Sequence, residues 1–425
     1  MKIAVIGTGI AGNVAAYRLA REHDVTVFEA DDRIGGHTNT VTVPWAGREY
    51  AVDTGFIVFN DRTYPRFIGL LDELGVASQA SDMSFSVQNE GAGLEYNGTS
   101  LNALFAQRSN LVRPSFYRMV ADILRFNRRA PRLLEVDAPG LTLGQFLEEQ
   151  HFSREFIDNY IIPMGAAIWS AEPGVMQRMP ASFFVRFFDN HGLLTVNDHP
   201  TWRVIQGGSR RYVDKLVAGH RDRIQLNAPV EQIRRLPGHV QVKLRGQDPQ
   251  RFDQVFIACH SDQALAMLVD PTPQERQVLG AIRYQHNQAV LHTDEKLMPR
   301  RRLAWAAWNY HVLRESNGLA AVTYNMNILQ GLDAPVQFCV TLNNAEGIDA
   351  SRVIRTIDYA HPVFTPEAVA AQGRHGEING VCRTYFCGAY WRYGFHEDGV
   401  VSALDALRHF EERRAHEQRD FRRVG

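Results

Sequence analysis

The sequence predicts an α/β protein of two or more domains, and three observations indicate this. The first residues read as a buried strand, a glycine-rich turn, a helix and a second buried strand. The middle of the chain, from about residue 81 to residue 197, is rich in aromatic residues at helical spacing, and strand patterns follow it. A length of 425 residues exceeds what one small core needs, and 45% hydrophobic with 22% charged residues is typical of a folded globular protein.

The opening segment has the pattern of a dinucleotide-binding turn. "KIAVIG" predicts the first strand, "GTGIAGNVAAYRLA" the turn and helix, and "DVTVFEA" the second strand. Gly7 permits the tight turn, Gly9 lets a pyrophosphate approach the backbone, and Gly12, next to Ala11, lets helix and strand pack closely. Glu29 ends the second strand, where a carboxylate accepts hydrogen bonds from ribose hydroxyls and repels a 2′-phosphate. A Rossmann-type fold is therefore expected, and NADP is disfavoured.

Two further motifs follow the turn, "EADDRIGGHTNT" and "YAVDTGFIVFN". Together with the turn, they resemble the superfamily of flavin amine oxidases, protoporphyrinogen oxidases and phytoene desaturases. The resemblance implies that the cofactor is FAD and that Glu29 holds its adenosine ribose. It also implies that Arg33, Gly36 and Thr38 lie near the diphosphate. Gly55 and Phe56 would border the flavin ring. His37 stands where the family often has arginine, which is the stronger phosphate donor at neutral pH.

The resemblance covers essentially the whole chain and implies two interleaved domains. A glycine turn at Gly207 and Gly208, with the strands after it, returns the chain to the FAD-binding domain, where the backbone of Val230 would contact the adenine. The expected FAD-binding domain, of the glutathione-reductase-like Rossmann type, comprises residues 1–80, 200–283 and 375–425. The expected α+β substrate domain comprises residues 81–199 and 284–374.

The stretch "FCGAYWRYGFHEDGVVSAL" lies near the end of the chain. In the superfamily it supplies the last strand and a helix whose N-terminus points at the flavin, where the helix dipole stabilises the negative charge of the reduced ring. Gly388 would lie near the cofactor, Gly399 and Val400 would act through backbone amides, and His396 would sit beside the ring. Relatives commonly have an acidic residue shortly after the glycine that matches Gly388, and this residue contacts the cofactor. Alanine and tyrosine follow Gly388 in this chain, so the acidic contact with the cofactor is missing or replaced.

No second GxGxxG motif indicates an NADPH site, so the substrate is expected to give hydride to the flavin. Amine oxidases of the superfamily typically carry a lysine near flavin N5. The best matching position here is Gln288, and Lys296 comes only later, so a primary amine substrate is disfavoured. His361 and His396 stand where walls of the substrate site are expected, and both are candidates for proton handling or substrate placement.

Three segments, "HPTWRVIQGGSRRYVD", "MPASFFVRFFDNHGLL" and "WAAWNYH", resemble a group of bacterial NAD/FAD-binding flavoproteins encoded near cyclopropane-fatty-acid synthase. This implies an unsaturated or methylated acyl-lipid substrate and a desaturase- or oxidase-type reaction. A cluster of apolar residues could line a tunnel or simply form helix core: Phe183, Phe184, Phe187, Phe188, Leu193 and Leu194. A flavin amine oxidase, a flavin-assisted double-bond isomerase and a non-enzymatic lipid-binding protein on the same fold remain alternatives.

Charge and composition exclude several other classes of protein. A net charge of −1 argues against nucleic-acid binding by the whole molecule, and the four cysteines form no CxxC or zinc-finger pattern, which favours a reducing cytoplasm without a structural metal. No apolar run reaches the length of about 18 residues that predicts a membrane-spanning helix. One basic amphipathic helix is predicted, and the residues of its basic face are Arg118, Arg125, Arg129 and Arg132. This face is either a solvated surface or a contact with an anionic membrane surface or an acidic carrier.

Overall fold

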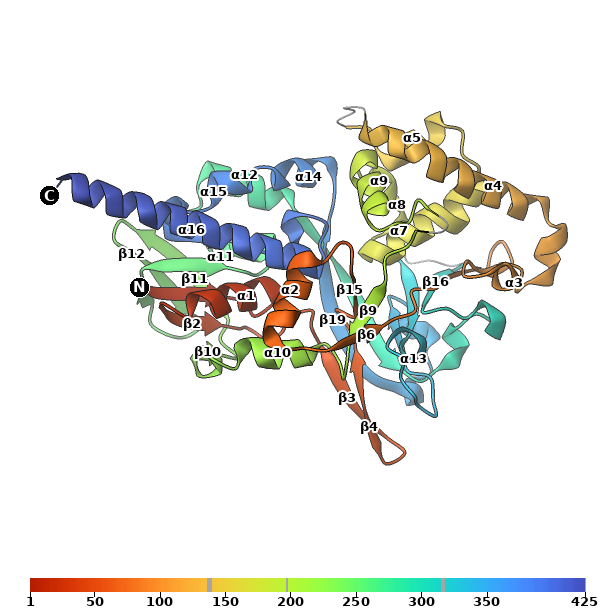
Figure 1. Ribbon diagram of the computed structural model, residues 1–425, viewed down its shortest axis with the longest axis horizontal. Helices are drawn as coiled ribbons and strands as arrows, with labels where there is room; N and C mark the ends of the chain where they lie inside the picture. The colour runs from red at the N-terminus through yellow and green to blue at the C-terminus, as the bar shows by residue number, and fades with distance from the viewer. Residues whose placement is uncertain (136–139, 196–197, 315–317, 425) are drawn as a thin grey trace.

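The computed structural model describes residues 1–135, 140–195, 198–314 and 318–424. Figure 1 shows two halves side by side. The first contains the N-terminus and the long C-terminal helix α16 (His396–Val424), and the second contains α4 (Pro114–Arg129), α5 (Leu143–Glu149) and α9 (Ala181–Asn190). Among the described residues, no helix combines the length and the apolarity needed to cross a membrane.

A five-stranded parallel sheet forms the centre of the first half, in the order β10-β2-β1-β14-β20. Successive side chains of its strands point to opposite faces: Ile3 and Val5 join one apolar cluster, and Ala4 and Ile6 join another. Because both faces are covered, the strands read as continuous apolar runs in the sequence. The strands are β1 (Lys2–Ile6), β2 (Asp24–Phe28), β10 (Ile224–Gln225), β14 (Gln254–Ile257) and β20 (Thr384–Phe386).

Different layers cover the two faces of this sheet. Helix α1 (Ile10–Leu19) and helix α16 pack against each other and bury the face to which Val5 belongs. A small antiparallel sheet, in the order β11-β12-β13, and a group of short helices bury the face to which Ile6 belongs. The elements of this second layer are β11 (Val230–Leu236), β12 (His239–Leu244), β13 (Gln250–Phe252), α11 (Ser261–Met267), α12 (Pro273–Ala281), α14 (Pro366–Gln372) and α15 (His375–Ile378).

The second half is built on a seven-stranded sheet, in the order β19-β15-β18-β17-β16-β7-β8. Its neighbouring strands are antiparallel, except for the parallel pair β16 and β7. Aromatic helices pack on it and form the largest core of the protein. The strands are β7 (Phe85–Asn89), β8 (Leu94–Asn97), β15 (Arg283–His292), β16 (Trp308–Val312), β17 (Ala321–Asn325), β18 (Cys339–Leu342) and β19 (Val353–Val363). The remaining helices here are α3 (Leu101–Leu104), α6 (Arg154–Phe156), α7 (Ile162–Trp169), α8 (Pro173–Arg178) and α13 (Met326–Leu329).

Two small sheets and two helices lie where the halves meet (Figure 1). One buried carboxylate fixes this junction: Asp53 accepts hydrogen bonds from the Ser209 amide (2.9 Å), the Ser209 hydroxyl (2.8 Å) and the Gln330 side-chain amide (2.9 Å). Three segments that are distant in sequence therefore meet at one side chain. The elements of the junction are β3 (Thr40–Trp45), β4 (Arg48–Asp53), β5 (Val58–Asn60), β6 (Ser78–Ala80), β9 (Trp202–Ile205), α2 (Pro65–Leu74) and α10 (Arg210–Val217).

The α/β class with a Rossmann-type sheet, which the sequence predicts, is confirmed. The parallel sheet takes strands from residues 2–28, 224–257 and 384–386, and the seven-stranded sheet takes strands from residues 85–97 and 283–363. The domain boundaries at residues 80, 199, 283 and 374 stay predictions. The pairing of strands shows which segments share a sheet, but it does not define the residue at which one domain ends and the next begins.

Candidate functional site

The turn between β1 and α1 forms an open cradle in front of a helix start. Gly7 has φ +98°, a left-handed conformation that favours glycine, and a Cβ on Gly12 would clash with the Gly7 carbonyl oxygen. A Cβ on Gly9, in contrast, would meet no atom within 4 Å. The space beside Gly9 is therefore free, at the positive end of the α1 dipole, where a phosphate is stabilised.

A second glycine segment faces this cradle. Gly36 has φ +57°, and a Cβ placed on it would lie 3.0 Å from the Cα of Gly9. Arg33 does not extend into the open space, because its guanidinium donates to the carbonyl oxygens of Gly36 (2.7 Å) and Thr38 (3.2 Å). The arginine therefore stabilises the loop, and the backbones of the two glycines are the groups that can approach a diphosphate.

Glu29, at the end of β2, lies beside the cradle. Its carboxylate accepts hydrogen bonds from the amide and the hydroxyl of Thr8 and from the Asp31 amide (3.0 Å). The Ala228 amide donates to the backbone oxygen of Glu29 (2.8 Å), so the chain entering β11 runs past this residue. Val230 itself is already the first residue of β11. Ala228 is thus bonded to the residue predicted to hold the ribose, and the predicted contact of the Val230 backbone with the adenine stays a prediction.

Three residues predicted beside the ring, and Thr38, predicted near the diphosphate, come together with a tyrosine that sequence reasoning missed. The His396 ring stacks on Phe56, with ring centroids 3.4 Å apart, and its Nε2 lies 3.0 Å from both Thr38 Oγ1 and the hydroxyl of Tyr212. A Cβ on Gly55 would clash with the His37 carbonyl oxygen, so this loop packs tightly on the double-glycine loop. Only the position of Tyr212 in "GGSRRY", after a glycine turn, could have pointed to it.

His361, in β19, lies next to His37. Its Nδ1 is 2.8 Å from the side-chain nitrogen of Asn287, and its ring centroid is 5.2 Å from that of His37. The Nε2 of His37 is buried and has no hydrogen-bond partner among the described residues. An unpartnered polar nitrogen next to the glycine loop fits a polar cofactor such as FAD.

Burial determines the charge of these imidazoles. Desolvation lowers the pKa of His396 to about 3 and that of His361 to about 4, and it holds the pKa of His37 well below its usual value. All three rings are therefore neutral at neutral pH. Neutral rings suit placement of a bound molecule through hydrogen bonds, and the predicted roles of His361 and His396 in proton handling or substrate placement stay predictions.

The start of α16 differs from the prediction in one respect. The Gly399 amide already donates to the Phe395 carbonyl oxygen (3.1 Å), so neither Gly399 nor Val400 offers a free amide, and the free amides belong to residues 396–398. A Cβ on Gly399 would lie 2.5 Å from Cγ2 of Ile10. Gly399 is thus needed for the close packing of α16 on α1, and the side chains of Ala11 and Val400 are buried in the same core.

The two carboxylates after His396 stabilise backbone turns. Glu397 accepts hydrogen bonds from the Arg66 amide (3.0 Å) and the Phe67 amide (2.8 Å) at the start of α2. Asp398 accepts hydrogen bonds from the Phe395 amide (2.9 Å) and the Tyr393 amide (3.2 Å), and its burial raises its pKa to about 7. Gly388, just after β20, donates to the Ser402 hydroxyl (2.9 Å) and leaves room for the ring of Tyr390.

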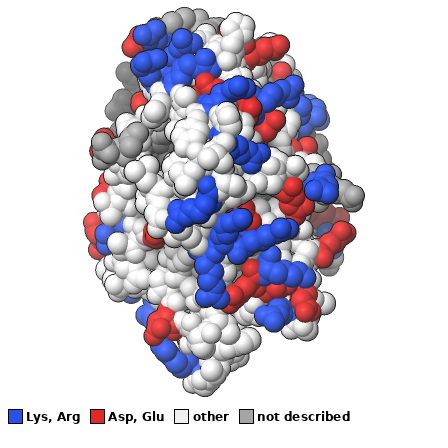
Figure 2. Space-filling model, turned by 90° about the vertical axis from the view of Figure 1, so that its right-hand side faces the viewer, with Lys and Arg blue, Asp and Glu red and all other residues white. Residues whose placement is uncertain are grey.

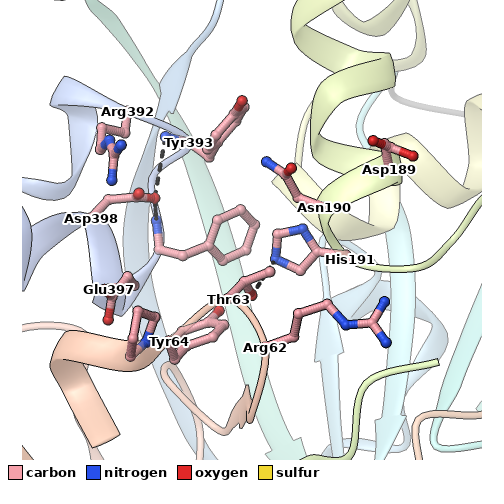
Figure 3. A pocket seen from close by; sticks show the side chains of 12 residues that line it. Arg62, Thr63, Tyr64, Asp189, Asn190, His191, Arg392, Tyr393, Glu397 and Asp398 are labelled. Carbon is pink, nitrogen blue, oxygen red and sulfur yellow. Dashed lines mark hydrogen bonds between the residues drawn. The ribbon is translucent and has the colours of Figure 1, made fainter. Parts of the chain in front are cut away.

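A cavity of about 440 Å³ opens beside the start of α16, where the two halves meet. Figure 3 shows Asn190 and His191 on one side of it and Arg392 and Asp398 on the other. The sequence did not predict it, because its walls come from three distant segments. The lining residues are Arg62, Thr63, Tyr64, Pro65, Asp189, Asn190, His191, Arg392, Tyr393, Phe395, Glu397 and Asp398.

Aromatic side chains from α9 stand behind one wall of this cavity. Phe183 packs on Tyr393 (ring centroids 4.6 Å apart), and Phe187 stacks on Phe395 (5.1 Å). Phe184 and Phe188 are buried in the core, and none of the six predicted tunnel residues lines the cavity. The helix-core interpretation of the α9 phenylalanines is therefore correct, and their contribution to the site is indirect.

The cradle can be tested at Gly9. Since Gly9 has φ −64° and its Cβ position is open, Gly9→Asp should fold, and aspartate is itself a favourable residue at a helix start. Its side chain and charge would occupy the diphosphate position, so FAD affinity should fall by at least about 100-fold. The measurement is the visible absorbance of bound flavin after FAD titration, with Gly219→Asp as the control at an open surface glycine. Normal flavin binding by Gly9→Asp would contradict the assignment.

Asp398 should make the folded state sensitive to pH. Its pKa is raised from 3.8 to about 7 on folding, so between these values the folded chain holds a proton that the unfolded chain does not, and stability falls as pH rises. Relative to Asp398→Asn, the wild-type free energy of unfolding should drop by up to about 4 kcal/mol between about pH 4 and pH 8. Urea unfolding across this range measures it, and Asp405→Asn, on the exposed side of the same helix, should run parallel to wild type. Parallel curves for Asp398→Asn as well would exclude this effect.

The chain is similar in sequence to AofH of Mycobacterium tuberculosis, a protein named for flavin-containing monoamine oxidase activity. The two are 29% identical over 289 residues, which are 65% of this chain and 61% of that protein, so the match spans less than two thirds of the relative. In structure, the chain resembles cyclohexylamine oxidase from Brevibacterium oxydans (TM-score 0.69, 16% identity, 97% of this chain and 99% of that chain). It equally resembles a CLA-producing fatty acid isomerase from P. acnes (TM-score 0.68, 17% identity, 96% of this chain and 98% of that chain). At these identities the structural likeness concerns the fold alone.

The family model described as flavin containing amine oxidoreductase matches residues 10–310, well over half of the chain. This match begins just after Gly9 of the cradle and covers α1, Glu29, the double-glycine loop and Tyr212. The resemblance predicted from the sequence is thereby confirmed. The chain belongs to the family of flavin-containing amine oxidoreductases, and its cofactor is FAD.

Proposed function

We propose that this chain removes hydride from an apolar acyl-lipid substrate, unsaturated or methylated, in a desaturase- or oxidase-type reaction. Bound FAD would supply the hydride acceptor. The backbones of Gly9 and Gly36 would hold its diphosphate, and Glu29 its ribose. The narrower likeness to flavoproteins encoded near cyclopropane-fatty-acid synthase stays a prediction.

The observation that carries this proposal is the placement of the four lysines of the chain. Each is engaged away from the histidines that surround the ring site: Lys2 lies over the Phe252 ring, Lys215 donates to the carbonyl oxygens of Leu74 and Gly75, Lys243 pairs with Glu231, and Lys296 pairs with Asp294. Gln288, the position that best matches the lysine of amine oxidases, is an exposed residue of β15. An amine-oxidising site of that type therefore lacks its usual lysine.

The character of the site agrees with an uncharged reacting group. His37, His361 and His396 are neutral, so none of them adds a fixed charge beside the ring position. Tyr393 and Phe395 give the adjoining cavity an aromatic wall on one side. Neutral imidazoles can orient a substrate by hydrogen bonds, and an aromatic wall binds an acyl chain by burial of apolar surface.

Amine oxidation is the second candidate, because the family match and the carboxylates Glu397 and Asp398 at the cavity both favour it. Fold likeness does not choose between the two, since an amine oxidase and a fatty acid isomerase match the chain about equally well.

Anaerobic reduction of the bound flavin distinguishes these candidates. Unsaturated and methylated phospholipids, and the corresponding free acids, should bleach the visible absorbance of the flavin, whereas primary amines and polyamines should leave it unchanged. Bleaching by amines alone would overturn the acyl-lipid proposal in favour of amine oxidation. Product analysis provides the control for isomerisation, in which the double bond moves and the flavin returns to its oxidised state.

A further inference from the structure

One end of the molecule exposes an unusual share of its large apolar side chains. Of the ten such residues that are exposed among those the structure describes, six belong to α3, α4 and the short 3-10 helices η1 (Arg108–Val112) and η6 (Arg302–Ala304). Val112 is 84% exposed and Leu101 is 78% exposed. We call this set the apolar tip: Leu101, Leu111, Val112, Tyr117, Leu124 and Leu303.

Contacts between these elements make the apolar tip one surface. The Tyr117 hydroxyl donates to the Leu111 carbonyl oxygen (2.9 Å), which fixes η1 against α4. Arg108 donates to the Phe105 carbonyl oxygen (2.9 Å) and so links η1 to the end of α3, and η6 packs against α3. Tyr117 and Leu124 are seven residues apart and therefore share one face of α4.

The same part of the chain is strongly basic. Residues 100–132 contain seven arginines and one acidic residue, Asp122, which is buried and paired with Arg125 (2.9 Å). Arg128 and Arg132 are exposed beside the apolar tip, and Arg302 is exposed next to Leu303. Figure 2 views this end of the molecule and shows basic side chains running across its middle, beside uncharged surface.

Only part of the arginine stripe predicted from helical spacing is free. Arg129 donates to the side chain of Gln150 (3.2 Å), and Arg125 stacks on the Phe152 ring, with 4.3 Å between its guanidinium carbon and the ring centroid. These two side chains hold α4 to the segment that follows α5. Arg118, whose guanidinium lies 3.5 Å from Glu155, and Arg132 are the two of the four predicted arginines that are exposed.

We infer that the apolar tip docks on the surface of an anionic lipid bilayer. Leu101 and Val112 project from short helical turns, a shape suited to insertion between lipid headgroups, and the neighbouring arginines match the negative charge of those headgroups. An acidic protein would match the charge of the arginines but not the protruding aliphatic side chains, which acyl chains between lipid headgroups do match. Docking on a bilayer would bring the protein to the proposed acyl-lipid substrate, but the evidence for docking does not depend on that proposed function.

Co-sedimentation of the FAD-loaded protein with vesicles tests the inference. Wild type should bind vesicles of phosphatidylcholine and phosphatidylglycerol, and bind pure phosphatidylcholine vesicles much less. The double variant Leu111→Ser, Val112→Ser should lose at least about tenfold in affinity, and Arg128→Gln, Arg132→Gln should weaken binding to anionic vesicles only. The matched control, Val269→Ser with Val353→Ser, changes two exposed valines on other parts of the molecule and should bind like wild type.

Three outcomes would overturn the inference: equal binding by the tip variant and wild type, equal loss in the control variant, or binding to soluble polyglutamate without binding to vesicles. Flavin absorbance reports that each variant is folded and loaded. Flavin reduction by detergent-dispersed acyl lipid should be the same in the tip variant as in wild type. Vesicle binding without such reduction would remove the acyl-lipid proposal alone, and reduction without vesicle binding would remove the docking surface alone.

Discussion

The close packing of the start of α16 on the start of α1 is the contact on which the rest of the site depends. Because Gly399 has no side chain, α16 approaches Ile10 to a distance that a Cβ would not allow. Since α1 begins directly after the glycine cradle, this contact places His396 beside Thr38 and Phe56. The last helix of the chain thereby completes a site that its first turn begins, and both helices present their N-terminal ends to the same region.

Burial at this junction then sets the electrostatics. Removing His37, His361 and His396 from water leaves three neutral imidazoles, and removing Asp398 from water raises its pKa toward neutrality. Glu397 and Asp398 accept backbone hydrogen bonds, so their charge mainly stabilises the turn before α16 and the start of α2. The imidazoles can therefore hold a molecule by shape, dipoles and hydrogen bonds, whereas the fixed charges lie in the adjoining cavity, which Arg62 and Arg392 line.

Local sterics explain which parts of the site could be predicted. Gly7, Gly9, Gly12 and Glu29 lie within 30 residues of one βαβ unit, so the residue types alone indicate the cradle. Gly7 and Gly12 are required by the turn itself, whereas Gly9 leaves the space beside the helix start open. Tyr212 and the contact between His37 and His361 could not be predicted, because segments separated by more than 150 residues meet there. The same reason applies to Gly399, where a glycine expected to expose an amide serves to let two helices touch.

Alone, the amino-acid sequence determined the Rossmann-type fold, the diphosphate cradle and the presence of an amphipathic α4, because strand alternation, glycine spacing and helical periodicity are properties of neighbouring residues. Tertiary structure alone decided which imidazoles meet, where the cavity opens and which arginines of α4 stay free. Arg125 and Arg129 belong to a stripe with solvent-facing spacing, yet residues 150–152 fold against them. Helical spacing defines a face, and only the packing of distant elements determines what covers it.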